Sequence, residues 1–178
     1  MPGVTVEELW RLALPAETAL AAGEVGLGRE VSWPALLRSR PPAFDQLRGG
    51  EVALVSMQAA RLLDERLTLP RILRSLIEMG VSAVAVVGEV EDEAKQLAEG
   101  AGVALLVLPA GSNLHRIEQA ITRAVIDRRV ELYQRSQDIY QQLTELVIAG
   151  RGVPAIVERL AQLTGRPVAL EDDALTLR

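Results

Sequence analysis

Two short apolar runs lie close together in the middle of the chain, and they predict neighbouring strands. Residues 81–87 and 103–108 are rich in valine and leucine, and both runs are bounded by glycine or proline. Runs of this length and composition are typical of buried strands in a parallel sheet. The charged stretch between them, residues 89–99, is long enough to form a crossover helix. The pattern therefore predicts a β-α-β unit at the centre of the domain.

Similar signals upstream predict further elements around this sheet. Thr5 and Glu8 have the spacing of a capping box, which predicts a short amphipathic helix that ends before Pro15. Strands are predicted for three more apolar runs: residues 18–22, 30–38 and 52–57. Pro34 places the second of these strands at a sheet edge or a bulge. Two further helices are expected at residues 58–66 and 69–79. The predicted fold class is therefore α/β, with a small mixed or parallel sheet flanked by helices.

A long helical pattern follows the sheet and covers residues 113–150. Apolar residues at three- and four-residue spacing in its first half predict that this part docks on the sheet. From Val125 onward one apolar track recurs every seven residues beside a partly polar one, which is typical of a weak coiled-coil seam. We therefore expect a homodimer. The predicted dimer seam consists of Val125, Leu132, Ile139, Leu143 and Leu146.

The last part of the chain, residues 151–178, has the pattern of a helix followed by two short strands. The helix is expected at residues 154–163, and the strands at residues 168–170 and 174–177 around an acidic turn. Elements this few cannot build a core of their own. The tail therefore either packs on another subunit or begins a second domain, and we favour the second alternative, a short α+β stub. The predicted organisation is an α/β domain at 1–112, a long helix at 113–150 and this stub at 151–178.

Composition narrows the possible chemistry. The net charge of −5 argues against a basic nucleic-acid-binding surface. The chain has no cysteine, which excludes disulfides, thiol catalysis and cysteine-type zinc sites. Its single histidine, His115, has no evident triad partner, so we expect a surface or packing role there. The cluster Glu89–Glu93 could suggest Mg²⁺, but its position at an expected helix start favours stabilisation by the helix dipole. We expect no catalytic residue, metal or cofactor.

The chain also shows no sign of a membrane or export signal. Its N-terminus lacks the basic and apolar regions of a signal peptide, and no apolar run approaches the length of about 18 residues that spans a bilayer. The expected location is therefore the cytoplasm.

A candidate ligand site follows from the expected sheet. Ligands of open α/β sheets gather beyond the carboxyl ends of the strands. The residues expected at those ends are Ser56, Gln58, Gly88, Glu89 and Ser112. The polar groups among them could instead only cap helices, which is the more common role for such residues, and the sequence leaves both interpretations open.

The order of several segments resembles the N-terminal domain of the purine-catabolism-regulator (PucR-type) family of bacterial transcriptional regulators. The matching segments are Thr5-Val-Glu-Glu-Leu9, Ala22-Gly-Glu-Val-Gly-Leu-Gly-Arg-Glu-Val-Ser-Trp33, Leu47-Arg-Gly-Gly-Glu-Val-Ala-Leu-Val55 and Ala104-Leu-Leu-Val-Leu-Pro109. The tail from Leu160 to Asp173 is similar to the opening of the GAF-like domain that follows in such regulators.

This resemblance implies an effector-responsive transcription factor. The α/β domain at 1–112 would be a sensor that acts through the long helix at 113–150 as a signalling helix, with a purine-related compound or another metabolite as its effector. DNA would be bound only by a C-terminal helix-turn-helix domain outside this chain. The alternative, from a different class, is a non-catalytic substrate-binding or accessory domain of a larger enzyme. The seven-residue stripe favours the regulator, because a signalling helix needs such a stripe and a substrate domain does not.

Overall fold

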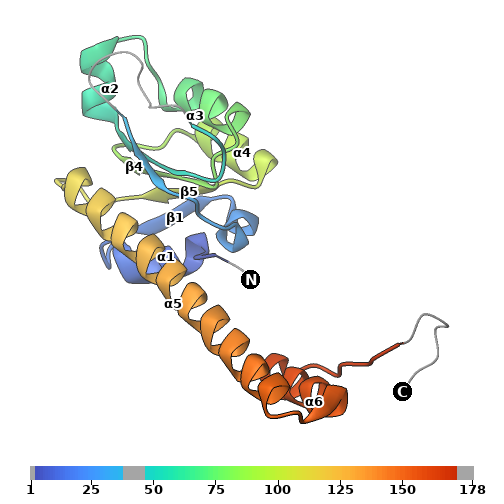
Figure 1. Ribbon diagram of the computed structural model, residues 1–178. Coiled ribbons are helices and arrows are strands. Elements are labelled where there is room, and N and C mark those ends of the chain that lie inside the picture. The colour runs from blue at the N-terminus through green and yellow to red at the C-terminus, as the bar shows by residue number, and fades with distance from the viewer. Residues whose placement is uncertain (1–2, 38–46, 172–178) are drawn as a thin grey trace. The chain divides into compact units, whose positions relative to one another are not determined.

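The computed structural model describes residues 3–37 and 47–171 (Figure 1). The chain packs as two compact units that divide between Arg129 and Val130. No helix within the described ranges is both long and apolar enough to cross a membrane.

The first unit is built on a five-stranded sheet with the order β1-β5-β4-β3-β2. The strands are β1 (Ala19–Ala22), β2 (Pro34–Leu36), β3 (Val52–Ser56), β4 (Ala83–Val87) and β5 (Ala104–Val107). Strands β2 to β5 pair in parallel, whereas β1 pairs with β5 in the antiparallel direction. The predicted β-α-β unit and the predicted mixed sheet are both confirmed. The position of β2 at one edge also agrees with Pro34, which has no N–H to donate to a second neighbour.

Helices cover both faces of this sheet. The helical elements of the first unit are α1 (Val6–Ala13), the 3₁₀ helix η1 (Glu24–Gly28), α2 (Met57–Leu63), α3 (Leu69–Glu78), α4 (Asp92–Ala101) and the first part of α5 (Leu114–Ile148). Figure 1 shows α3 and α4 on one face and α1 with the start of α5 on the other. The result is a three-layer α/β/α arrangement.

The alternation of side chains along the strands divides the core into two apolar clusters. Val84 and Val86 of β4 pack with α3 and α4, whereas Ala83 and Ala85 of the same strand pack with α1 and α5. Buried residues on both faces explain why the strands are nearly continuous apolar runs in the sequence. Small residues on the α5 side allow that helix to approach the sheet closely, and Ile121 is completely buried there.

Two helix starts follow the sequence signals. Thr5 Oγ1 accepts a hydrogen bond from the Glu8 N–H at 3.2 Å, and the Thr5 N–H donates to Glu8 Oε2 at 2.9 Å, so the predicted capping box of α1 is confirmed. Asn113 Oδ1 accepts from the Arg116 N–H at 3.0 Å and caps α5. Both devices satisfy backbone N–H groups that lack a partner within the first helical turn.

The second unit consists of the later part of α5 and α6 (Gly152–Thr164). Arg159 joins the two helices, because its Nε and Nη2 donate to Gln142 Oε1 at 3.1 and 2.7 Å. The strand predicted at residues 168–170 is wrong, since this stretch has no regular structure. Its pattern of two apolar residues around one alanine is too short to specify a strand without a neighbouring strand to pair with. The strand predicted at 174–177 lies outside the described residues.

Candidate functional site

The carboxyl ends of β3, β4 and β5 meet at one edge of the sheet, because these three strands run in parallel. A cleft of about 1110 Å³ opens at this edge, and we call it the strand-edge cleft. Its walls come from the start of α2 and from the segments that follow β4 and β5. The lining residues are Ser56, Met57, Gln58, Arg61, Leu62, Glu65, Val87, Gly88, Glu89, Val107, Leu108, Pro109, Ala110 and Gly111. An open edge of this kind is the usual ligand position in parallel α/β sheets.

Two residues give the cleft its local shape. Ser56 ends β3 and caps α2, since its Oγ accepts a hydrogen bond from the Ala59 N–H at 3.2 Å. Gly88 follows β4 with a φ of +145°, a conformation that residues with a side chain rarely adopt. A Cβ at this position would lie 2.9 Å from Cβ and Cγ of Met57. Glycine is therefore required for the first turn of α2 to pack directly over the end of β4.

The structure brings most of the predicted ligand-site residues together. Ser56, Gln58, Gly88 and Glu89 all line the strand-edge cleft. Ser112 is not among the lining residues, and its Oγ donates instead to the Pro109 carbonyl oxygen at 2.7 Å. That hydrogen bond holds the turn between β5 and α5. Ligand binding by these five residues stays a prediction.

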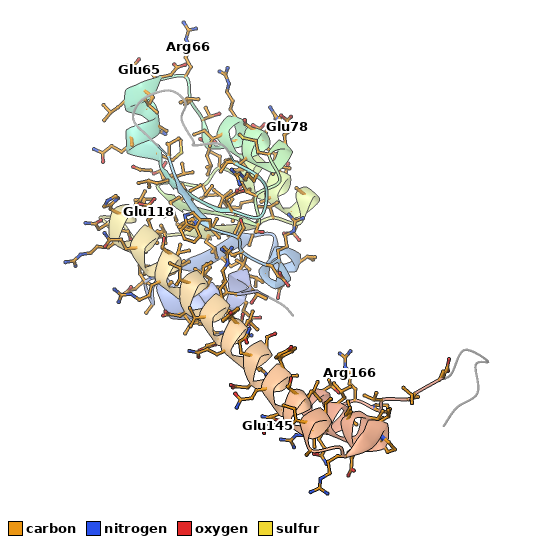
Figure 2. The ribbon with its side chains drawn as sticks, viewed as in Figure 1. Glu65, Arg66, Glu78, Glu118, Glu145 and Arg166 are labelled. Carbon is orange, nitrogen blue, oxygen red and sulfur yellow. The ribbon has the colours of Figure 1, made fainter. Side chains whose placement is uncertain are left out.

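Sequence reasoning missed three side chains of the cleft, Arg61, Leu62 and Glu65. Arg61 and Leu62 follow Gln58 at spacings of three and four residues, which is one face of α2, and this spacing could have identified them once Gln58 was placed at the edge. Glu65 lies in the turn after Leu63, the last residue of α2, so helical spacing could not have placed it. In Figure 2, Glu65 lies at the outer end of α2, beside Arg66.

The arrangement in the strand-edge cleft suits binding better than catalysis. One guanidinium (Arg61) and two carboxylates (Glu65 and Glu89) stand beside the neutral amide of Gln58 and an apolar floor. Such a mixture can hold a small polar or zwitterionic compound. The hydroxyl of Ser56 is engaged as a helix cap, and no histidine lines the cleft to activate it as a nucleophile.

The acidic residues after the cleft belong to the first turn of α4. Asp92 Oδ1 accepts from Lys95 Nζ at 2.8 Å, and Glu93 pairs with Arg74 at 3.4 Å. The hydrogen bond and the charge of Lys95 lower the pKa of the Asp92 carboxyl. Among residues 3–37 and 47–171, no group of three histidine or carboxylate side chains is placed to hold a metal ion. Asp92 and Glu93 therefore interact with basic side chains at the start of α4, where the helix dipole also favours negative charge.

The structure places the predicted seam residues in two environments. Val125 is only 2 % exposed and belongs to the α5-side core cluster of the first unit. The other four, which are Leu132, Ile139, Leu143 and Leu146, are half-buried. His115, the single histidine, is exposed in the first turn of α5 and pairs with Glu118 at 3.1 Å.

Comparison with known proteins identifies the first unit. Residues 8–125 match the sequence profile described as the purine catabolism regulatory protein-like family. No curated protein matches the chain. The matched segment runs from α1 to the buried part of α5 and includes every strand of the sheet. Because it covers more than half of the sequence, the chain belongs to the purine catabolism regulatory protein-like family.

Proposed function

We propose that this member of a regulator family is the sensory and dimerisation region of a transcription regulator. A small metabolite, purine-related or of another class, binds in the strand-edge cleft as its effector. The occupied cleft changes α5, and α5 transmits the change to a DNA-binding domain that lies C-terminal to this region.

The connection between the cleft and α5 is the observation that carries the proposal. Val107 to Gly111, the segment that leaves β5, forms one wall of the strand-edge cleft. The chain then continues through Ser112 to Asn113, which caps α5. An effector that contacts this wall therefore touches the backbone that sets where α5 begins. It shifts the helix only if it binds one arrangement of the wall more tightly than the other.

The second unit supports dimerisation through α5. None of residues 130–171 is fully buried, so the helix pair of this unit lacks a core of its own. Three large side chains on α5, Tyr133, Tyr140 and Val147, are exposed at seven-residue spacing. The predicted seam residues Leu132, Ile139 and Leu146 directly precede them along the helix. A second copy of the chain presents the same spacing and can cover this broad stripe in a coiled coil.

A thermal-shift screen with purines, ureides and amino acids tests the effector part of the proposal. We expect a compound that raises the melting temperature of the wild type, since a ligand of the folded state stabilises it by mass action. Glu65→Gln should weaken that shift, whereas Glu78→Gln, which changes an exposed carboxylate on α3, should leave it unchanged. A shift that survives Glu65→Gln, Gln58→Ala and Gly88→Ala alike would place the ligand elsewhere.

Light scattering tests the dimer. The wild type should have the mass of two chains, and Leu132→Asp/Ile139→Asp or Tyr133→Asp/Tyr140→Asp should reduce it to one, because buried unpaired carboxylates oppose association. Gln134→Asp introduces the same charge at an exposed position on the opposite face of α5 from the predicted seam, and it serves as the control that keeps the dimer. A monomeric wild type, or double variants that remain dimeric, would rule out this seam.

A further inference from the structure

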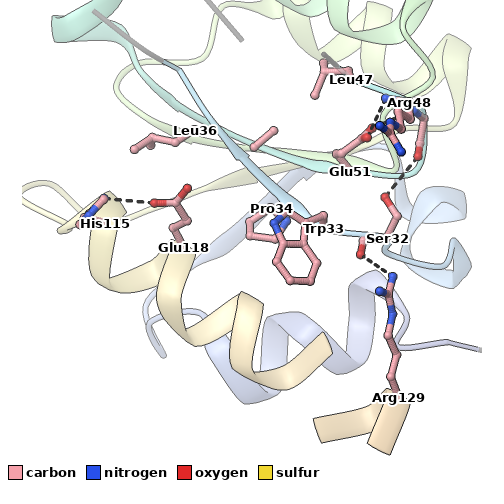
Figure 3. A pocket seen from close by; sticks show the side chains of 12 residues that line it. Ser32, Trp33, Pro34, Leu36, Leu47, Arg48, Glu51, His115, Glu118 and Arg129 are labelled. Atoms are coloured by element: carbon pink, nitrogen blue, oxygen red, sulfur yellow. Dashed lines mark hydrogen bonds and ion pairs between the residues drawn. The ribbon is translucent and has the colours of Figure 1, made fainter. Parts of the chain in front are cut away.

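A second cleft of about 720 Å³ lies at the free edge of β2, away from the strand-edge cleft, and we call it the β2 cleft (Figure 3). Its walls are β2 with the preceding Trp33, the turn before β3, and side chains of α5. All of them belong to the first compact unit. None of these residues was predicted as a ligand site from the sequence, because they come from three separate parts of the chain.

The carboxylates at this cleft are already engaged. Glu51 is 7 % exposed, and its two oxygens accept hydrogen bonds from the backbone N–H groups of Arg48 and Gly49 at 2.8 and 2.9 Å. Glu118 pairs with His115 on α5. Figure 3 shows both carboxylates directed at these partners. They are therefore poorly placed to hold a ligand cation.

Whereas these carboxylates are engaged, the two guanidinium groups of the cleft have no partner of opposite charge among the described residues. Arg48 is exposed and has no acidic partner among residues 3–37 and 47–171. Arg129 donates from Nη2 to the Ser32 carbonyl oxygen at 3.1 Å and lies 5.9 Å from the centre of the Trp33 ring. A neutral carbonyl and an indole leave the positive charge of Arg129 without a counter-charge from any residue that the structure describes. The binding capacity left in the cleft is thus for an anion.

An apolar wall runs between the two arginines and the start of α5. It consists of Trp33, Pro34, Leu36 and Leu47. Trp33 is 41 % exposed, which is high for a residue that lies against a sheet edge. A large aromatic surface left open beside guanidinium groups that have no acidic partner in the described part of the chain suits a flat organic acid, since the ring covers the body and a guanidinium binds the carboxylate.

We propose that the β2 cleft binds a small organic carboxylate with a flat apolar body. The carboxylate binds to Arg48 and Arg129, and the body lies on Trp33 and the neighbouring apolar side chains. The volume falls within the range of pockets that hold small organic ligands. This site is additional to the effector cleft of the proposed function and does not depend on it.

Occupancy of this cleft has a consequence for α5. Arg129 is the last residue of the first compact unit, and its contacts with Ser32 and Trp33 hold that turn of α5 to the sheet edge. Ser32 in turn donates from Oγ to the Gly49 carbonyl oxygen at 3.2 Å. A carboxylate that binds Arg129 competes with the Ser32 carbonyl for the same guanidinium. The ligand therefore acts on α5 at the point where the first unit ends.

Tryptophan fluorescence tests the proposal directly. Trp10→Phe leaves Trp33 as the only tryptophan, and circular dichroism checks that this variant is folded. Benzoate is the anionic probe, and benzamide is its neutral match of the same shape, both titrated at constant ionic strength. We expect a saturable change in Trp33 emission with benzoate, and binding of benzamide weaker by about tenfold or more, because a charge-assisted hydrogen bond is roughly twice as strong as a neutral one.

Variants made in the Trp10→Phe background identify which residues bind the carboxylate. Arg48→Ala should weaken benzoate binding by about tenfold, and the fold should survive because this side chain is exposed and makes no ion pair in the described part of the chain. Arg66→Ala is the matched control, since Arg66 points into solvent beyond α2 (Figure 2) and should leave binding unchanged. Glu65→Gln alters the other cleft and should also have no effect.

Two results would overturn the proposal. Equal responses to benzoate and benzamide would show that the arginines do not select an anion. Benzoate binding that survives Arg48→Ala, or that is lost in Glu65→Gln, would place the carboxylate outside the β2 cleft. Neither result bears on the effector of the proposed function, which is measured by thermal shift and by variants of the strand-edge cleft.

Discussion

Val125→Ala should lower the free energy of unfolding by about 2 kcal/mol, because Val125 is a core residue of the first unit. The sequence pattern assigns the same residue to a dimer seam, where its truncation would weaken association instead. The substitution therefore separates two roles that the seven-residue spacing cannot distinguish.

The magnitude follows from the surroundings of Val125. The side chain is 2 % exposed and packs in the same cluster as Leu106 of β5 and Ile117 and Ile121 of α5. Removing two buried methyl groups costs about 1.6 kcal/mol in transfer free energy, and the cavity left behind adds roughly 1 kcal/mol. Alanine is a better helix former than valine and returns about 0.5 kcal/mol. The net loss is therefore about 2 kcal/mol.

Urea denaturation followed by circular dichroism measures this loss. Val25→Ala is the matched control, since it removes the same atoms from a residue that is 83 % exposed, and it should change stability by less than about 0.5 kcal/mol. Repeating the titration at several protein concentrations separates folding from association, because only a dimer contact makes the midpoint depend on concentration. Light scattering on the variant should show the mass of the wild type.

A Val125→Ala variant as stable as Val25→Ala, but with a reduced mass, would refute this reasoning. That result would mean that Val125 contacts a second chain and not the sheet of its own.

Three further substitutions test other features. Gly23→Ala should cost about 3 kcal/mol or more in urea denaturation, because its Cβ would lie 1.9 Å from the Val103 carbonyl oxygen at a φ of +76°. Gly88→Ala should cost about 1 to 3 kcal/mol and weaken any ligand of the strand-edge cleft. Glu8→Gln should flatten the acid dependence of stability. The backbone hydrogen bond from Thr5 lowers the Glu8 pKa, so the wild-type advantage exists above the ordinary value of 4.5 and disappears as the pH falls through the lowered one.

Matched controls sharpen these measurements. Gly28→Ala should be nearly neutral, since a Cβ there meets no atom within 4 Å, and a loss equal to that of Gly23→Ala would contradict the steric argument. For the carboxylate, Glu17→Gln provides an exposed glutamate outside the capping box. Parallel acid titration curves of the wild type and Glu8→Gln would show that the capping box does not produce the shift.

The parts of the fold that could be predicted from sequence depend on local signals. The runs that became β3, β4 and β5 are apolar because the sheet is covered on both faces, so their composition alone indicates buried strands. The capping box at Thr5 and the cap at Asn113 involve residues three positions apart. Such signals need no knowledge of the rest of the chain.

The parts that escaped prediction depend on long-range contacts. The β2 cleft forms because Arg129 of α5 reaches the backbone of Ser32, two residues that are 97 positions apart. The antiparallel pairing of β1 with β5 likewise brings Ala19 opposite Val107. At the strand-edge cleft, by contrast, the general rule for parallel sheets placed Ser56 and Gly88 at the carboxyl ends of β3 and β4, where the structure has them, because the rule depends only on where strands end. Their role in ligand binding stays a prediction. Ser112 was placed in the cleft by the same rule, but its hydroxyl turns to Pro109.

The predicted seam of α5 illustrates why one residue spacing is compatible with two kinds of contact. An apolar residue at every seventh position lies on the same face of a helix, whether that face meets a sheet or another helix. At Val125 the face meets the sheet, and the side chain is almost fully buried. At Leu132 and Ile139 the same track is only half-buried, in a unit that has no buried residue among those described. The change in burial along one unbroken track therefore favours a partner for the later residues, and it assigns the earlier one to the protein's own core.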